Sequence, residues 1–316
     1  MIPPLLLLLL LLVITDTLAT LRLSDYNSSF VGYPDVMLIG VQKGGTTSLY
    51  FLLVKILKLY VTSHTKEAQF FSFNFNDDAF NKYITGFDEM KRVDGDLPTF
   101  DGSPSYFDIP KAWDNIKSLY SPECLRQKKF ILSLREPVAR EVSWFHHYFG
   151  NGLRFNDASA DQNRHLTFHE RVQSITRWSG IGNYLQNIKN ALKVIHRDQL
   201  FIVSFETLTG AEEQDTINRL LYFLGTPPVY TRGSFFPKRN TAEDHCGEFC
   251  DKPELHEIFC SDLRILNETY SKLNEGLLEF INSAPDRPPS EPQFQPFSER
   301  LSEKCIGDDG KLMDFN

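Results

Sequence analysis

A stretch rich in glycine and hydroxyl groups near the start of the chain has the composition of an anion-binding loop. Four apolar residues, Val36–Ile39, run into Gly40 and predict a short buried strand. From Ser48 onward the apolar residues recur at helical spacing. The loop between strand and helix contains Lys43, Gly44, Gly45, Thr46 and Thr47. Because such glycines let the backbone approach an anion and the helix start points its N–H groups at it, this stretch predicts a phosphate or sulfate site.

The position of the lysine distinguishes this loop from an ATP-binding P-loop. Gly40 and Gly45 have the P-loop spacing, after which Lys and Ser or Thr should follow. Here Thr46 and Thr47 follow, and the lysine lies inside the loop at Lys43. A lysine there approaches the anion from another side, which favours a nucleotide with a shorter 5′ tail than ATP. The alternative is a glycine turn with a surface lysine.

A second anion-binding pattern follows a later strand. The apolar run that ends at Leu134 leads to Arg135, and Pro137 stands where a first helical residue is expected. Arg135 can clamp a phosphate through two N–H groups, and Ser143 on the helix can add a third donor. Arg140, on the same helix, is expected to be exposed. A P-loop NTPase places an aspartate at such a strand end to hold Mg²⁺, so an arginine there predicts an anion site and no metal.

A charged pair between a predicted strand and two phenylalanines is a candidate for acid–base chemistry. Lys66 and Glu67 follow a predicted strand at 59–62 and precede Phe70 and Phe71. At the carboxyl edge of a parallel sheet, Glu67 could take a proton from a hydroxyl group. The alternative is a surface ion pair above two core side chains. His64 is a second candidate base.

These stretches resemble the Golgi carbohydrate sulfotransferases, particularly the heparan sulfate type, which use 3′-phosphoadenosine-5′-phosphosulfate (PAPS) as sulfuryl donor. Residues 41–47 look like the 5′-phosphosulfate loop of that family. Residues 134–140 together with Ser143 resemble its 3′-phosphate signature, and residues 66–71 resemble its Lys-Glu-x-His/Gln-Phe-Phe segment, in which the glutamate is the catalytic base. The similarity extends from residue 36 to about residue 241.

The resemblance implies a role for each matching residue. Glu67 would be the catalytic base and Lys43 would stabilise charge on the leaving phosphate. The donor would be held by Lys43, Gly44, Gly45, Thr46, Thr47, Arg135, Ser143 and, from a later basic loop, Lys238 and Arg239. The acceptor, a hydroxyl or amine of a glycosaminoglycan or other carbohydrate, would be contacted by Lys66, Gln69 and Ser103. No metal is implied.

Strands that alternate with helices predict an α/β fold, a P-loop-containing three-layer sandwich with a mostly parallel central sheet. The donor would then bind at the carboxyl edge of that sheet. We expect a leader at 1–19, the sulfotransferase domain at 34–283 and a Pro-rich tail at 284–316 that does not join the core. A last helix is expected from about Pro253 to Phe280.

The leader and the cysteines indicate the secretory pathway. The leucine-rich run at 5–14 is short for a membrane span and fits a signal peptide, with an uncleaved signal-anchor as the alternative. The Golgi lumen or secretion is therefore expected, with glycosylation acceptors at Asn27 and Asn267. One or two disulfides are expected among Cys124, Cys246, Cys250, Cys260 and Cys305. The alternative is a zinc site built from Cys246, Cys250 and Cys260 with the nearby His245 and His256.

The net charge of −8 argues against a broad nucleic-acid-binding surface. It also means that a polyanionic acceptor would need a local basic cleft. Two rival functions stay open at this point. One is a nucleotide kinase or NTPase, and the other is a non-catalytic secreted protein on the same scaffold.

Overall fold

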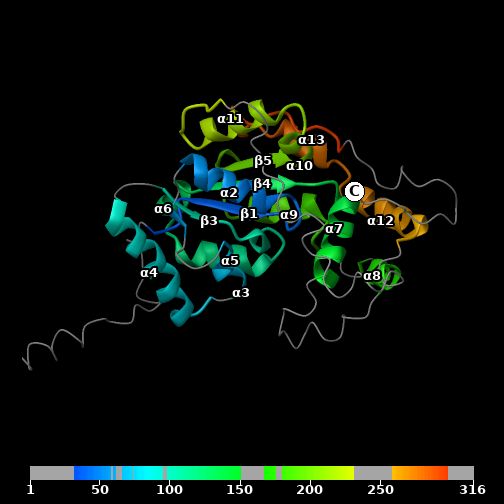
Figure 1. Ribbon diagram of the computed structural model, residues 1–316, viewed down its shortest axis with the longest axis horizontal. Coiled ribbons are helices and arrows are strands. Elements are labelled where there is room, and N and C mark those ends of the chain that lie inside the picture. Colours follow the sequence, from blue (N-terminus) through cyan, green and yellow to red (C-terminus); the bar gives the residue numbers. More distant parts are fainter. Residues whose placement is uncertain are drawn as a thin grey trace, which may run out of the picture.

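The computed structural model describes residues 32–57, 60–61, 66–73, 75–94, 98–150, 167–175, 180–230 and 258–297. Within these residues, five strands form one sheet in the order β2-β3-β1-β4-β5 (Figure 1). The strands are β1 (Val36–Gly40), β2 (Tyr60–Val61), β3 (Thr99–Asp101), β4 (Lys129–Leu134) and β5 (Leu200–Ser204).

All four strand pairings are parallel, so the predicted parallel sheet is confirmed. The central strand β1 pairs with β3 on one side and with β4 on the other, and Met37 lies opposite both Asp101 and Phe130. The outer strands add to this core, β2 on β3 and β5 on β4. The carboxyl ends of all five strands therefore meet at one edge of the sheet.

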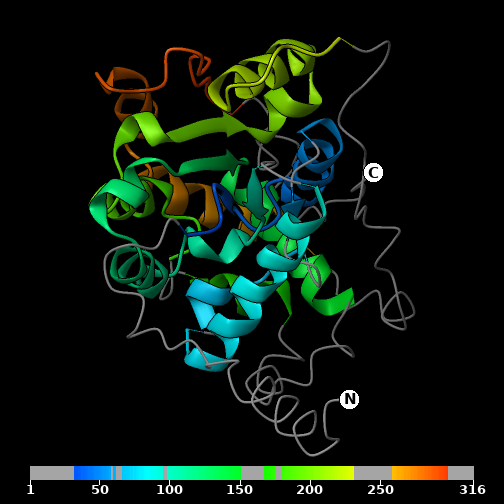
Figure 2. The same cartoon turned by 90° about the vertical axis from the view of Figure 1, so that its left-hand side faces the viewer.

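Helices cover both faces of the sheet (Figures 1 and 2). One face carries α2 (Thr46–Leu57), α10 (Phe205–Thr209) and α11 (Glu213–Phe223). The other carries α3 (Phe70–Phe73), α4 (Asp77–Asp94), α5 (Pro110–Leu119), α9 (Tyr184–Ala191) and α13 (Leu277–Ser283), with the short helix α6 (Pro122–Arg126) nearby. Two 3-10 turns, η2 (Pro104–Tyr106) and η4 (Arg197–Gln199), precede α5 and β5.

The alternation of side chains along β1 explains the three layers. Met37 and Ile39 point into the core on the α3–α5 face, whereas Val36 and Leu38 point into the core on the α2–α11 face. A strand buried on both faces needs a continuous apolar run, which is the pattern of this segment. The three-layer α/β sandwich predicted from the sequence is thus confirmed.

A third, smaller core lies beside the sheet, among α7 (Pro137–Gly150), α8 (Phe168–Ile175) and α12 (Cys260–Leu273). The expectation that Arg140 is exposed is wrong. Its side chain is fully buried and forms an ion pair with Glu141, which is also buried. The face of α7 that carries Arg140 is covered by neighbouring helices, which a single helical pattern does not reveal.

The end of the chain differs from expectation in two respects. The predicted long last helix is two helices, α12 and α13, separated at Gly276, whose φ of 77° lies outside the helical region. The segment 284–297 also packs on the core, since Phe294 is 5% exposed and lies within the main hydrophobic cluster. The tail of this domain therefore begins later than residue 284.

A buried acidic residue explains why this Pro-rich segment joins the core. Glu291 accepts hydrogen bonds from both terminal nitrogens of Arg197, at 3.1 and 2.5 Å, and from the backbone N–H of Ile202 at 2.8 Å. Ile202 lies on β5, the edge strand of the sheet, and Figure 2 shows the C-terminal segment beside it. An edge strand presents unpaired backbone groups, and Glu291 satisfies one of them.

Candidate functional site

The predicted site residues come from loops that leave the carboxyl ends of neighbouring strands. The loop 41–47 follows β1, Ser103 follows β3, and Arg135 follows β4. Lys66 and Glu67 follow β2 in the chain and lie against the first of these loops. The fold thus brings four distant segments to one edge of the sheet, as expected for a ligand site in an open parallel sheet.

The loop after β1 is fixed to the neighbouring strand β4. Val41 N–H donates to the Ser133 carbonyl at 2.8 Å, and the Ser133 hydroxyl donates to the Gly44 carbonyl at 2.6 Å. A Cβ at Gly44 would lie 2.5 Å from the Ser133 oxygen, so only glycine allows this approach. Gly45 has a φ of 76°, a conformation that glycine adopts without strain. The two glycines are therefore required by the geometry of the loop.

The loop leads directly into the N-terminus of α2. The first helical hydrogen bond runs from Leu49 N–H to the Gly45 carbonyl, so the N–H groups at positions 46–48 have no partner within the helix. Thr46 begins the helix and is buried, whereas Thr47 is half-buried. This helix start presents N–H groups and a positive dipole end at the loop, which is the arrangement that binds phosphate and sulfate groups.

Three cationic side chains surround the same loop. Burial and, to a smaller extent, the positive charges of Arg135 and Lys66 together lower the pKa of Lys43 to about 8, while Glu67 opposes the shift. Lys43 itself has a φ of 67°, uncommon for a residue with a side chain. Cations repel one another, so their proximity is most stable when an anion lies among them. The electrostatics of the site therefore match the anion-binding prediction.

Arg135 is held in place from three sides. Its Nη1 donates to the Lys43 carbonyl at 3.1 Å, and its guanidinium stacks on the Phe205 ring with 4.8 Å to the ring centroid. The Tyr184 hydroxyl donates to the Arg135 carbonyl at 2.8 Å. Ser143 lies half-buried on α7, further along the helix that follows Arg135. An arginine fixed in this way can meet a phosphate with little loss of side-chain entropy.

Two carboxylates that were not predicted as site residues lie at the turn after Arg135. Glu136 accepts hydrogen bonds from Val138 N–H at 3.1 Å and Ala139 N–H at 2.6 Å and thereby caps α7. Burial raises the pKa of Glu136 to about 7, and these backbone hydrogen bonds oppose the shift. Glu206 accepts from the Glu136 N–H at 3.0 Å and so links β5 to the same turn. The Glu136-Pro137 pair at the start of a helix is the sequence feature from which this cap could have been predicted.

Lys66 connects the loop after β1 to the candidate base. Its ammonium donates to the Thr47 hydroxyl at 3.0 Å and to the Glu67 carboxylate at 2.7 Å. The side chains are partly open to solvent, with 17% of Lys66 and 33% of Glu67 exposed. Glu67 therefore lies beside the anion-binding loop and is accessible to a second molecule.

Gln69 and Ser103 meet behind Glu67. Gln69 adopts a φ of 52°, its backbone N–H donates to the Ser103 hydroxyl at 2.9 Å, and its side-chain amide donates to Glu67 at 3.4 Å. Ser103 is fully buried, so its hydroxyl lies behind the loop that carries Gln69. The Ser103 hydroxyl donates its own hydrogen to Asp101, at 2.6 Å. Sequence reasoning missed Asp101, although a buried strand that ends in an acidic residue was a usable signal.

Comparison with known proteins identifies the family. The sulfotransferase domain family matches residues 33–241 of this chain, which include the loop after β1, the Lys66–Gln69 segment and Arg135. The chain belongs to the sulfotransferase domain family.

Two relatives illustrate how distant the similarity is. The human protein heparan sulfate glucosamine 3-O-sulfotransferase 3B1 is 27% identical over 260 residues, covering 76% of this chain and 61% of the relative. The mouse protein bifunctional heparan sulfate N-deacetylase/N-sulfotransferase 4 is 27% identical over 205 residues, covering 62% of this chain and 23% of the relative. The chain thus spans about three-fifths of the first relative's length and less of the second. Among solved structures, a sulfotransferase from Alicyclobacillus acidocaldarius has a TM-score of 0.48 at 18% identity, covering 76% of this chain and 96% of that one.

Several positions singled out in the sequence lie outside the described residues: His64, Lys238, Arg239, Cys246, Cys250, Cys305, Asn27 and the leader 1–19. Of the cysteines in the described ranges, Cys124 is buried and free, and Cys260 is disulfide-bonded. In those ranges no group of three or more His, Cys, Asp or Glu side chains could hold a metal ion. Nor does any helix placed there have the length and apolar character to cross a membrane.

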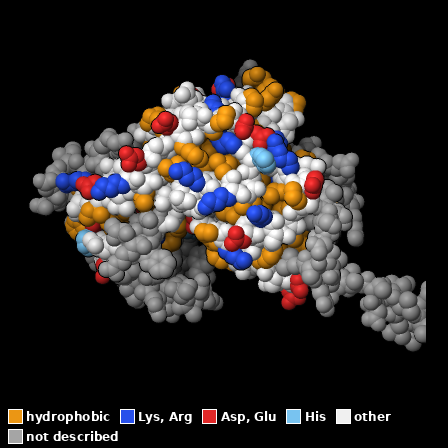
Figure 3. All heavy atoms as spheres, turned by 180° about the vertical axis from the view of Figure 1, so that it is seen from behind, with side chains coloured by type: hydrophobic (Ala, Val, Ile, Leu, Met, Phe, Trp, Pro, Cys, Tyr) orange, Lys and Arg blue, Asp and Glu red, His pale blue; other side chains and the backbone are white. Residues whose placement is uncertain are grey.

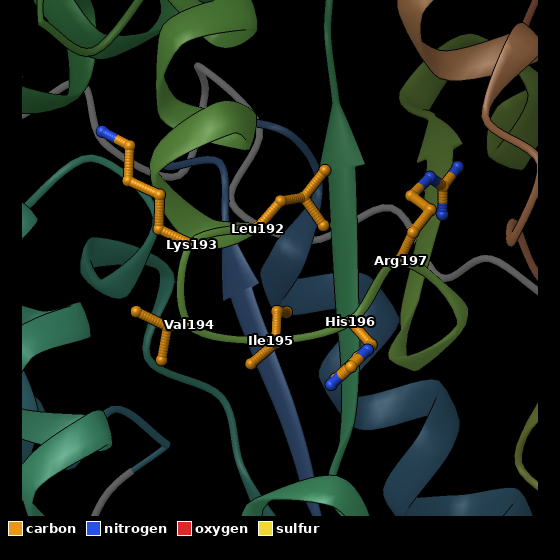
Figure 4. Close-up of a pocket in the computed structure, with 6 residues that line it drawn as sticks. All are labelled: Leu192, Lys193, Val194, Ile195, His196 and Arg197. Atoms are coloured by element: carbon orange, nitrogen blue, oxygen red, sulfur yellow. The ribbon is translucent and has the colours of Figure 1, made fainter.

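A surface hollow elsewhere on this sulfotransferase domain contains none of the candidate residues. Residues 192–197 line it, on the loop between α9 and β5 (Figure 4). Because this loop precedes β5, it lies toward the amino edge of the sheet, whereas the glycine loop follows β1 at the carboxyl edge. The candidate site is therefore defined by the converging loops and not by this hollow.

Proposed function

We propose that this protein transfers a sulfuryl group from PAPS to a hydroxyl or amine of a glycan, with Glu67 as general base and without a metal. The observation that carries the proposal is the position of Lys66, which bonds both Thr47 of the anion-binding loop and Glu67. An anion site and a solvent-accessible carboxylate are thereby adjacent. That arrangement suits the transfer of an anionic group to a proton-bearing nucleophile.

The donor fits the residues present. The loop residues Lys43–Thr47 and the start of α2 would hold the 5′-phosphosulfate, and Arg135 and Ser143 would hold the 3′-phosphate, with Lys238 and Arg239 as further contacts. Support comes from the surroundings of the loop, where burial and then the neighbouring cations Arg135 and Lys66 lower the pKa of Lys43 to about 8. When bound, the donor supplies an activated sulfuryl group with a phosphate oxygen as leaving atom.

Each of the site residues would then have a separate role in the transfer. Glu67 would take the proton from the acceptor while the acceptor oxygen or nitrogen bonds to sulfur and the bond from sulfur to the phosphate oxygen breaks. Lys43 would compensate the negative charge that grows on that oxygen. Lys66 would orient Glu67, and Gln69 would support the second carboxylate oxygen and face the acceptor.

The acceptor class is inferred from the relatives, whose names state that they act on heparan sulfate glucosamine. On the face shown in Figure 3, Lys and Arg side chains are interspersed with Asp and Glu. A polyanionic glycan could thus meet local positive charge despite the overall negative charge of the protein.

The cellular context is proposed on the same basis. A sulfotransferase domain at about 34–283, extended by the packed segment to residue 297, would follow a signal peptide or signal-anchor at 1–19. The protein would act in the Golgi lumen or be secreted, with glycosylation at Asn27 or Asn267. Cys260 would bond one of Cys246, Cys250 and Cys305, in keeping with that compartment.

The first experiment tests the donor site. We expect calorimetry to show that 3′-phosphoadenosine-5′-phosphate (PAP), the product nucleotide, binds the wild type without metal. Arg135→Ala should weaken this binding at least about tenfold, or about 1.4 kcal/mol, because a phosphate would lose a bidentate partner. Arg219→Ala is the matched control, since Arg219 lies on the surface of α11 and pairs only locally with Asp215.

Two results would overturn the donor assignment. Binding of ATP with Mg²⁺ in place of PAP would support the nucleotide kinase or NTPase alternative. Equal binding by wild type and Arg135→Ala would mean that the arginine does not contact the nucleotide. PAP binding without transfer to any glycan would instead support the non-catalytic scaffold.

The depressed pKa of Lys43 predicts proton uptake on donor binding. In the free protein about half of the Lys43 side chains are neutral at pH 8, since the pKa is about 8. An anion beside Lys43 favours the ammonium form and raises this pKa, so PAP binding at pH 8 should take up about half a proton. At pH 6.5 the lysine is already protonated, and uptake should be close to zero.

Calorimetry in buffers of different ionisation enthalpy measures this uptake directly. Lys43→Met should bind PAP more weakly and abolish the uptake at pH 8. Proton uptake that persists in Lys43→Met would assign it to another group and contradict the prediction.

A further inference from the structure

A buried carboxylate lies directly behind the loop that carries Glu67. Asp101, the last residue of β3, is 2% exposed and accepts three hydroxyl hydrogen bonds. Tyr83 and Tyr106 donate to one oxygen at 2.8 and 2.7 Å, and Ser103 donates to the other at 2.6 Å. Burial raises the pKa of Asp101, and these three hydrogen bonds oppose the shift.

The hydroxyl of Ser103 links Asp101 to Gln69. A serine hydroxyl has one hydrogen to donate and lone pairs to accept with. The hydrogen of Ser103 points to Asp101, at 2.6 Å. The Ser103 oxygen is then left as an acceptor, and it receives the Gln69 N–H at 2.9 Å.

This hydrogen bond holds Gln69 in an uncommon conformation. Its φ of 52° lies in the left-handed region, which is unfavourable for a residue with a side chain. In that conformation the Gln69 amide faces Glu67, at 3.4 Å. The helix α3 begins at the next residue, and its buried Phe70 and Phe71 fix the chain on the other side.

We propose that Asp101 and Ser103 are positioning residues of the sulfuryl-transfer site, which hold Gln69 and, through its amide, set the orientation of the Glu67 carboxylate. The linkage runs from Asp101 through Ser103 and Gln69 to Glu67, and Lys66 continues it to Thr47 in the donor loop. The same series of hydrogen bonds would thereby hold residues on the acceptor side and on the donor side of the site. The resemblance implied that Ser103 contacts the acceptor; its full burial assigns it this different role. Only the catalytic consequence of this proposal rests on the proposed function.

Ser105 provides a matched control. It is 1% exposed and lies in η2, whose N-cap is Ser103, and its hydroxyl pairs with that of Ser72 at 3.0 Å. Ser103→Ala and Ser105→Ala each remove one buried hydroxyl from this segment. Only the first removes the acceptor of the Gln69 N–H.

The first test does not depend on activity. Hydrogen–deuterium exchange of the peptide 66–73, measured by mass spectrometry on the full chain, should increase in Ser103→Ala and stay at the wild-type level in Ser105→Ala. Ser103→Thr retains a hydroxyl and should restore part of the protection. Equal exchange in the wild type and in Ser103→Ala, or an equal increase in both alanine variants, would overturn the positioning role.

The second test measures transfer from labelled PAPS to heparan sulfate. Ser103→Ala should lower kcat at least about tenfold while the KM for PAPS and the calorimetric Kd for PAP stay within about twofold. Ser105→Ala should keep both kcat and KM. A wild-type kcat in Ser103→Ala would overturn the catalytic consequence. Failure of the wild type to bind PAP would instead overturn the proposed function. The exchange experiment would still decide whether Ser103 holds Gln69 in place.

Discussion

Replacing Glu67 with glutamine should slow sulfuryl transfer by about 100-fold or more, the usual contribution of a general base. Gln has nearly the same shape but cannot accept the acceptor proton. The hydrogen bond from Gln69 can be retained by the new amide oxygen, whereas the ion pair with Lys66 at 2.7 Å is lost. PAP binding should change little, because the nucleotide is held by the loop after β1 and by Arg135.

Two further variants sharpen this prediction. Glu67→Asp keeps a carboxylate but withdraws it by one methylene, so we expect its rate to fall between those of the wild type and Glu67→Gln. Glu279→Gln removes an exposed carboxylate on α13 and should have no effect. Transfer from labelled PAPS, followed at saturating donor, measures all three. Wild-type transfer by Glu67→Gln would show that another group takes the proton.

Glu291→Gln should destabilise the fold by about 3 to 5 kcal/mol, the range for a buried ion pair that loses one partner. Arg197 is 7% exposed and Glu291 is fully buried, so the guanidinium would keep its charge without a carboxylate. The same change weakens the acceptor for Ile202 N–H on the edge strand. The loss should appear as a lower midpoint of denaturation in guanidinium chloride with an unchanged slope.

An exposed ion pair of the same type serves as the control. Asp215 and Arg219 on α11 are 2.6 Å apart, with 68% and 44% of their side chains exposed. Asp215→Asn should therefore cost less than about 1 kcal/mol. Replacing Arg197 and Glu291 together with methionine should recover much of the stability lost by Glu291→Gln, because no unpaired charge is then buried. Similar losses for Glu291→Gln and Asp215→Asn would show that burial of the pair contributes little.

Predictions from the sequence were most accurate where the signal is local. The apolar run 36–39 requires burial on both faces, and β1 is the central strand of the sheet. Gly44 and Gly45 were predicted in a loop between strand and helix, and they lie there, with Gly44 close to the Ser133 carbonyl and Gly45 at a positive φ. Predictions of exposure were less accurate. Arg140 is buried by helices from other parts of the chain, and the Pro-rich segment after residue 284 is anchored by Glu291.

By itself the sequence determined the strand, glycine loop and helix start of an anion site, together with the identity of the cationic and acidic residues near it. These features depend on backbone conformation and on residues adjacent in the chain. Only the tertiary structure decided which side chains meet. Lys66 and Thr47 are 19 residues apart, Gln69 and Ser103 are 34 apart, and Arg197 and Glu291 are 94 apart. Contacts over such separations are set by the order of the strands and the packing of helices on the sheet, because that arrangement brings remote segments of the chain together.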